Sequence, residues 1–144
     1  MFTLLFICGS INYQMEVNMA YTFSNEIISD LHKDARGYRP SQDFYEMWNE
    51  SSDDTKQEVW DMLIEEMQIR DQEEMELQRK ALVELRASLR SVMKLMKCDW
   101  KVALRVLANA EDIDLEQDFD YFLWNQGVGF DDRNKISKLY KEAA

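Results

Sequence analysis

The chain has 144 residues, of which 46% are hydrophobic and 12% aromatic, and this argues against wholesale disorder. One proline and four glycines are too few for a turn-rich β fold, so we expect an all-α protein of five or six helices. The net charge of −11 opposes the approach of nucleic acid at long range. No apolar stretch reaches the roughly 20 residues that span a bilayer.

The first 18 residues differ from the rest of the chain. The apolar residues 1–10 lack the basic flank and the cleavage site of a signal peptide. We therefore expect translation to start at Met15 or Met19, with residues 1–18 a non-native or disordered extension and residues 19–144 a single helical domain. The two cysteines are far apart and have no CxxC neighbour, which indicates a reducing compartment and neither a disulfide nor a zinc site.

Two short helices are expected before residue 50. Residues 24–36 place apolar side chains at helical spacing, and Gly37 follows at the position of a C-terminal cap. Pro40 disfavours helix at the residue before it and marks a linker. Ser41 then predicts the N-cap of a second helix that ends near Asn49.

A long helix is expected from about residue 55 to 97, because the stretch TKQE forms a capping box and no glycine or proline follows it. It would be roughly 60 Å long. Residues 68–80 have too few apolar groups to be buried, and we expect them to form an exposed bridge within one continuous helix. Beyond them, apolar residues spaced 3-4-3-4 predict a coiled-coil-like seam that joins copies of the chain into a homo-oligomer. The seam residues are Leu82, Leu85, Leu89, Val92 and Met96.

Three shorter helices complete the predicted fold. Asp99 is a candidate N-cap for a helix over residues 100–110. The stretch DLEQ from Asp114 resembles a second capping box and opens a helix that ends near Gln126. Asp131 is expected to cap the last helix.

The charge alternates in blocks along the chain. It is −1, −11, +6, −8 and +3 for residues 1–42, 43–78, 79–105, 106–132 and 133–144. Closely spaced carboxylates on a helix can imitate the phosphates of nucleic acid and occupy a basic groove of another protein, or they can serve solvation alone. The carboxylates assigned to such an acidic partner-binding face are Asp61, Glu65, Glu66, Glu73, Glu74, Glu76, Asp112, Asp114 and Asp118.

No catalytic, cofactor or metal motif is visible, so we expect a protein that is not an enzyme and has no cofactor. His32 is the one histidine, and it predicts a surface or capping role. The acidic run from Asp112 does not fit a calcium loop, because its sixth position is Gln117 where such loops need glycine. The basic strip over residues 79–105 leaves direct nucleic-acid binding open, with Arg86, Arg90 and Lys94 as its testable members.

Residues 23–41 read FSNEIISDLHKDARGYRPS and resemble the opening of small proteins encoded by tailed bacteriophages and prophages. The resemblance implies a phage gene product in the bacterial host cytoplasm and supplies no activity. The helix end within this motif either receives a carboxylate or phosphate of a partner or only forms a tight corner between two helices. Its residues are His32, Lys33, Arg36, Tyr38 and Arg39.

These observations lead to three functional hypotheses. The first is an acidic protein-interaction module that blocks or modulates a host factor, such as a nucleic-acid-handling or defence protein. The second is a structural or scaffolding protein that forms a helical oligomer or binds other phage proteins. The third is a nucleic-acid binder that uses the basic strip.

Overall fold

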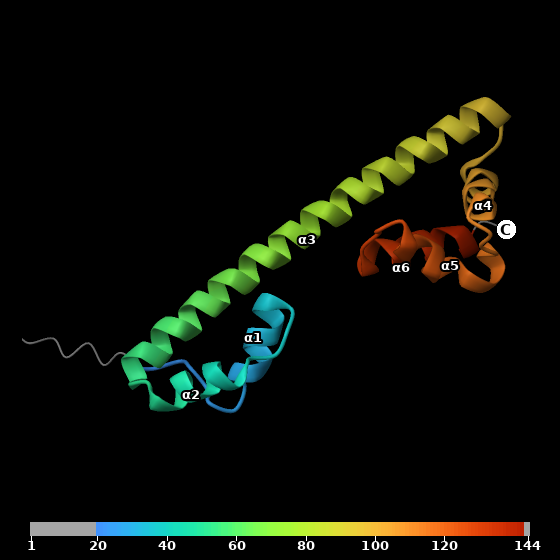
Figure 1. Cartoon of the computed structure of the whole chain (residues 1–144). Helices are drawn as coiled ribbons and strands as arrows, with labels where there is room; N and C mark the ends of the chain where they lie inside the picture. Colours follow the sequence, from blue (N-terminus) through green and yellow to red (C-terminus); the bar gives the residue numbers. More distant parts are fainter. Residues whose placement is uncertain (1–19, 143–144) are drawn as a thin grey trace, which may run out of the picture.

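The chain folds into six α-helices over residues 20–142, the range that the computed structural model describes (Figure 1). No strand occurs in that range, which confirms the expected all-α fold with one long helix. The predicted extension at residues 1–18 lies outside the described residues. The helices are α1 (Ile28–Arg36), α2 (Gln42–Glu50), α3 (Asp53–Met96), α4 (Trp100–Ala110), α5 (Leu115–Asn125) and α6 (Phe130–Glu142).

Capping side chains set most of the helix starts. Ser41, Asp99 and Asp114 accept hydrogen bonds from backbone N–H groups in the first turns of α2, α4 and α5, as predicted. The predicted cap of α3 is wrong. Ser52 accepts a hydrogen bond from the N–H of Thr55, so the helix begins before the predicted capping box.

Two further boundaries differ from the prediction. α1 begins at Ile28 rather than residue 24, because residues 25–27 form a turn. α6 begins at Phe130, so Asp131 lies in the first helical turn, where its charge favours the helix dipole. The end of α1 is as predicted, since Gly37 has a φ of 86° and its N–H donates to the carbonyl oxygen of Lys33.

α3 is one continuous helix of 44 residues, about 66 Å long at 1.5 Å per residue. Over residues 68–80 every residue except Gln78 is exposed, which confirms the exposed bridge. The helix ends at Met96, and the capping residue Lys97 has a left-handed conformation and donates its N–H to the carbonyl oxygen of Met93.

The first part of α3 packs with α1 and α2 to form an N-terminal lobe. Trp48 of α2 lies in the core of this lobe, and its indole N–H donates to the Asn25 side-chain oxygen at 2.9 Å. Its buried core residues are Ile28, Leu31, Ala35, Trp48, Trp60 and Leu63.

The second half of α3 packs with α4, α5 and α6 to form a C-terminal lobe. The connection between α5 and α6 approaches α3 closely: a Cβ atom on Gly127 would lie 3.1 Å from the Cβ of Ala81. A glycine is also needed there because the φ of Gly127 is 81°. The buried core residues of this lobe are Leu85, Leu104, Ala108, Ile113, Leu115, Phe122, Leu123 and Val128.

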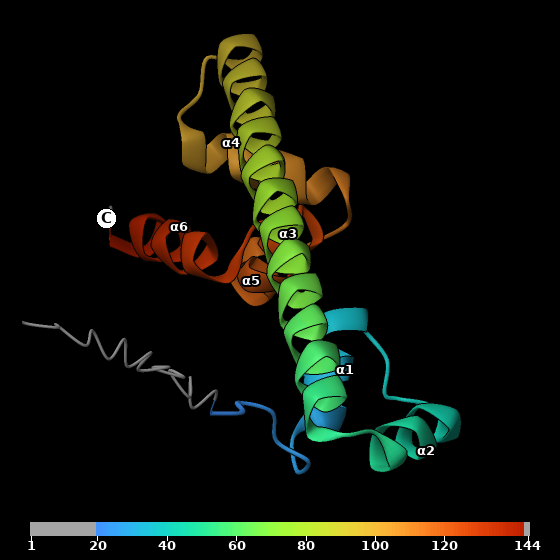
Figure 2. The same cartoon turned by 90° about the vertical axis from the view of Figure 1, so that its left-hand side faces the viewer.

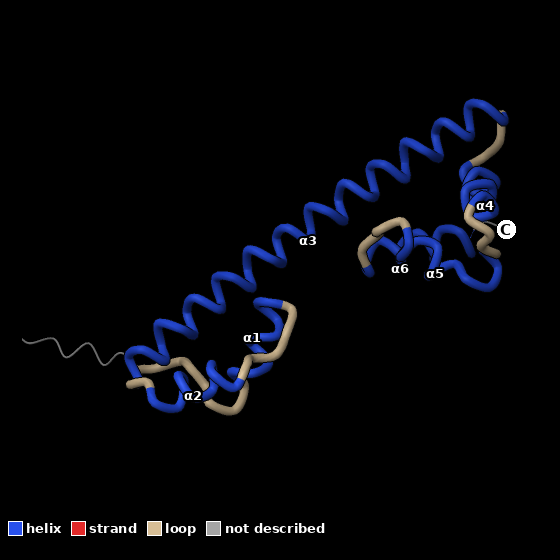
Figure 3. Tube along the Cα trace, viewed as in Figure 1, coloured by secondary structure: helices blue, strands red, loops and turns tan. Residues whose placement is uncertain are grey.

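Both lobes lie on the same side of α3 (Figures 1 and 2). Helical spacing places the buried residues Trp60 and Leu85 on that side. Met62, Ile69 and Val83, which are separated by multiples of seven residues, lie roughly opposite and are 44%, 50% and 52% exposed. We call the side of α3 that points away from the lobes the outer face. The molecule is therefore elongated, with α3 joining two lobes that lie on the same side of it. Its loops lie within the two lobes (Figure 3).

The seam predicted to join two copies of the chain lies largely against the chain's own C-terminal lobe. Leu85 is 4% exposed, and Leu82 and Leu89 pack against the same core. Val92 is half-buried, whereas Met96 is exposed at the end of α3. Helices α4 to α6 thus occupy the side of α3 that the sequence pattern had assigned to a second copy.

Candidate interaction surface

The predicted corner after α1 is a packed joint. His32 was expected in a surface or capping role, and the surface role is wrong because the residue is 3% exposed. Its ring lies edge-on to the rings of Phe44 and Tyr38, with centroids 4.9 and 5.4 Å away. His32 Nδ1 is 2.9 Å from the carbonyl oxygen of Tyr38. A carbonyl oxygen can only accept, so Nδ1 carries the proton and holds the backbone beyond the helix end.

The two arginines of the corner form contacts within the chain. Arg36 donates from Nε and Nη2 to the two carboxylate oxygens of Glu66, at 2.8 and 3.0 Å. This hydrogen bonding lowers the pKa of Glu66 and raises the pKa of Arg36. Arg39 donates to Ser29 and Asp30 of α1. These contacts favour the tight-corner interpretation over a partner site.

The predicted acidic face does not form one surface. Asp61, Glu65, Glu73 and Glu76 project toward the outer face by helical spacing, whereas Glu74 lies on the side of the lobes. Glu66 is used in the ion pair with Arg36. Two more of the predicted carboxylates accept hydrogen bonds from neighbours on α3. Asp61 accepts one from Gln57, and Glu76 accepts two from Arg79. The bonds from Arg79 lower the pKa of Glu76.

The three remaining carboxylates of that set lie in the C-terminal lobe, around the start of α5. Asp114 caps α5 through its side chain. Asp112 has a φ of 59° in the turn before it, and Asp118 has non-helical backbone angles within the helix. These residues therefore shape the backbone at the start of α5. They lie in the C-terminal lobe, apart from the predicted carboxylates in the first half of α3.

A concave surface that the sequence did not reveal lies between the lobes, along the exposed middle of α3. It begins as a hollow of about 410 Å³ beside the end of α1. Arg70 crosses this hollow and donates to the carbonyl oxygen of Asp34 at 3.3 Å. The residues that line it are Lys33, Asp34, Gly37, Met67, Arg70, Asp71 and Glu74.

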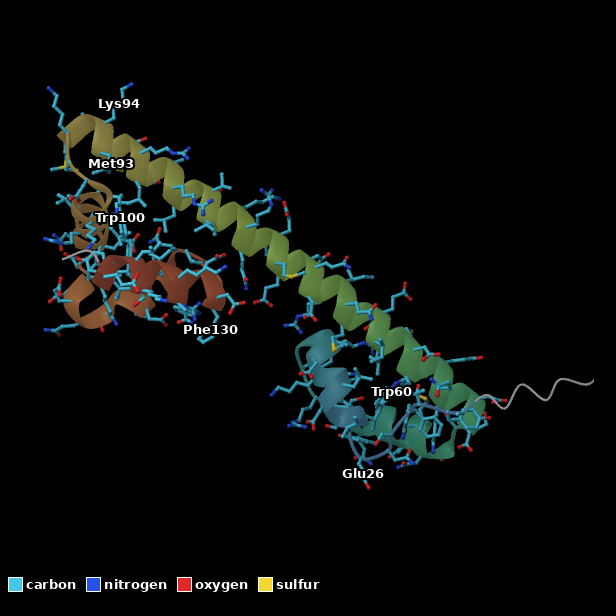
Figure 4. The ribbon with its side chains drawn as sticks, turned by 180° about the vertical axis from the view of Figure 1, so that it is seen from behind. Glu26, Trp60, Met93, Lys94, Trp100 and Phe130 are labelled. Atoms are coloured by element: carbon cyan, nitrogen blue, oxygen red, sulfur yellow. The ribbon has the colours of Figure 1, made fainter. Side chains whose placement is uncertain are left out.

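A second hollow of about 450 Å³ follows directly along α3, beside the start of α6. Phe130 lies there at the edge of the C-terminal lobe, and its side chain is drawn in Figure 4. The lining residues are Met75, Gln78, Arg79, Leu82, Gly129, Phe130, Asp131 and Asp132. We call the two hollows together the notch.

The notch combines negative charge with exposed apolar groups. Its lining has five carboxylates and three basic side chains. Met75 and Phe130 are 62% and 65% exposed, so the notch presents two large apolar side chains to solvent. The sequence signal for Met75 was its isolated position in a polar stretch, but nothing local indicated that Phe130 lies beside it.

Some side chains of the basic strip over residues 79–105 form contacts within the chain. Arg79 pairs with Glu76, and Arg105 donates from Nε to the Tyr140 hydroxyl at 3.0 Å. This contact raises the pKa of Arg105. Arg86, Arg90 and Lys94 are exposed along the second half of α3.

Within residues 20–142, no three histidine, cysteine, aspartate or glutamate side chains are grouped so that they could hold a metal ion. None of the helices in that range has the length and apolar character needed to cross a membrane. Comparison of the chain with protein-family models, with curated proteins and with solved structures finds no significant match.

Proposed function

We propose that this protein is an interaction module that binds a basic element of a partner protein in the notch and thereby blocks or modulates that partner. The observation on which the proposal rests is the notch itself, an acidic concave surface with Met75 and Phe130 exposed beside it. Protein interfaces commonly combine a few central apolar anchors with a polar rim.

The size of the notch suggests the kind of element that enters it. The stretch of α3 from Arg70 to Gln78 covers eight residue steps, or about 12 Å. This is close to the diameter of a single α-helix with its side chains. A helix with one apolar ridge and flanking lysine or arginine residues would contact Met75 and Phe130 and place its charges near the carboxylates.

The walls of the notch are fixed before any partner binds. On one side, the ion pair of Arg36 with Glu66 attaches the end of α1 to α3. On the other side, Gly129 lies so close to α3 that a Cβ atom there would overlap the Gln78 side chain. A preformed surface loses little conformational entropy on binding, which favours affinity.

The identity of the partner is proposed from the resemblance of residues 23–41 to phage proteins. In this proposal the chain acts in the cytoplasm of the bacterial host, and its partner is a host nucleic-acid-handling or defence factor. Such factors present basic helices and grooves to nucleic acid, and an acidic surface would compete for them.

A second candidate function uses the outer face in place of the notch. Glu65, Glu73 and Glu76 follow one another there over about three helical turns and are exposed. A row of carboxylates on a straight helix can imitate nucleic-acid phosphates more directly than a concave surface can. The two candidates therefore place the contact on opposite sides of α3.

The experiment that tests the proposal compares two double variants of the full chain. Asp71→Lys with Glu74→Lys alters the notch, and Glu65→Lys with Glu73→Lys makes the same charge change on the outer face. Tagged proteins are incubated with nuclease-treated bacterial lysate, washed with rising salt and analysed by quantitative mass spectrometry. Circular dichroism verifies that both variants fold.

We expect a partner captured by the wild type to be lost from the notch variant and retained by the outer-face variant. The reverse pattern would favour the nucleic-acid mimic. Retention of the partner by both variants would contradict both candidate functions.

A further inference from the structure

The charge of α3 reverses near its middle. Residues 53–78 contain ten acidic and two basic side chains, whereas residues 79–96 contain five basic and one acidic. Packing within the chain neutralises little of this separation, because both lobes lie on one side of the helix and leave the outer face open.

The outer face has the composition of a weak helix-pairing surface. Met62, Ile69 and Val83 repeat at heptad spacing and are about half exposed. Glu65 and Glu73 flank the first part of this row, and Lys80, Arg90 and Lys94 follow on the second part. Glu76 occupies the heptad position between Ile69 and Val83, so the row combines three apolar side chains with acidic groups in one half and basic groups in the other.

We propose that the outer face binds a second copy of this chain, with the two α3 helices antiparallel. In that orientation the acidic half of each helix faces the basic half of the other, and the twofold axis lies near the charge reversal between Glu76 and Arg79. A parallel arrangement would place like charges opposite one another along the whole contact. Charge complementarity thus selects both the partner and its direction.

This self-association is independent of the proposed function. The notch lies on the side of the lobes, so pairing through the outer faces leaves both notches of the dimer open. It also differs from the predicted seam, because Leu85 and its neighbours are covered by the C-terminal lobe.

The expected contact is small. The outer face from Met62 to Lys94 covers 32 residue steps, so it is about 48 Å long, and a helix surface is about 10 Å wide. The contact area is then roughly 480 Å² on each copy, below the roughly 800 Å² of a standard stable interface. A reversible dimer that weakens as salt rises follows from this size and from its dependence on charge pairs.

Sedimentation velocity of the full chain, over a range of concentrations and at low and high salt, measures this dimer. Two variants reverse the charge of one half each: Glu65→Lys with Glu73→Lys, and Arg90→Glu with Lys94→Glu. We expect each variant alone to raise the dimer dissociation constant at least tenfold. An equimolar mixture of the two should recover a dimer, because the reversed halves match each other.

The control is the notch variant, Asp71→Lys with Glu74→Lys, which makes the same change of charge as Glu65→Lys with Glu73→Lys but on the other side of α3. We expect its dimerisation to equal that of the wild type. The proposal is overturned if the wild type is a monomer at every concentration, if the notch variant weakens the dimer as much as the outer-face variants do, or if the mixture does not recover it.

Discussion

Arg36 and Glu66 join the end of α1 to α3 through two parallel hydrogen bonds, at 2.8 and 3.0 Å. The two residues are 30 positions apart, and their side chains are 30% and 36% exposed. The pair fixes the α1 side of the notch, so its effect on stability reports how firmly that side is held.

Glu66→Gln should lower the free energy of unfolding by about 1 kcal/mol or less, because solvent screens a partly exposed pair. The pKa of Glu66 is lowered in the folded state, so its stabilising effect is present above the pKa of the unfolded chain and is lost as pH falls through the folded pKa. Urea unfolding of wild type and variant should therefore differ at neutral pH and converge in acid, once the pH falls below the lowered pKa of Glu66. A difference that grows as pH falls would contradict the assigned role.

His32→Ala should destabilise the N-terminal lobe by about 2 kcal/mol, because it removes a buried ring and the hydrogen bond to the Tyr38 carbonyl oxygen. Lys33→Ala is the matched control, since Lys33 is the next residue and is exposed. Thermal unfolding followed by circular dichroism measures both. Equal midpoints for the two variants would show that the packed corner contributes nothing to stability.

Gly127→Ala should lower stability by about 1–2 kcal/mol, because the residue has a positive φ and the new Cβ would crowd Ala81. Ala81→Gly in the same chain should relieve the crowding but not the backbone strain. A double-mutant cycle by urea unfolding therefore predicts a favourable coupling between the two changes. Purely additive effects would mean that the α5–α6 connection does not press against α3.

The separate cores predict that the lobes lose structure separately. Leu104 is fully buried in the C-terminal lobe, and Leu104→Ala should cost about 3–5 kcal/mol there. Hydrogen exchange should then rise across α4, α5 and α6 while α1 and α2 keep the protection of the wild type. Uniform loss of protection in both lobes would indicate one cooperative unit, as the single-domain prediction implies.

The features that the sequence predicted correctly are local ones. Ser41, Asp99 and Gly37 cap helices through bonds within a few residues, so their neighbours along the chain are sufficient evidence. Ser52 took the place of the predicted cap because several capping residues are consecutive there, and the sequence alone does not rank them.

The missed features depend on contacts between distant residues. The spacing of Leu82, Leu85 and Leu89 shows that one side of α3 is covered, but it is the same whether a second copy or α4 to α6 covers it. His32 follows Leu31 and lies four residues after Ile28, so its burial did have a signal in the apolar spacing. The notch joins Met75 to Phe130, which no pattern within one helix relates.

Zero-length cross-linking of the captured complex tests the central claim most directly. A carbodiimide joins carboxylates to lysines only where they touch, and mass spectrometry then identifies the residues. Binding in the notch predicts that partner lysines couple to Asp71, Glu74 or Asp131. Partner cross-links confined to Glu65 and Glu73 on the outer face, or to Asp112 and Asp118 at the far lobe, would contradict it.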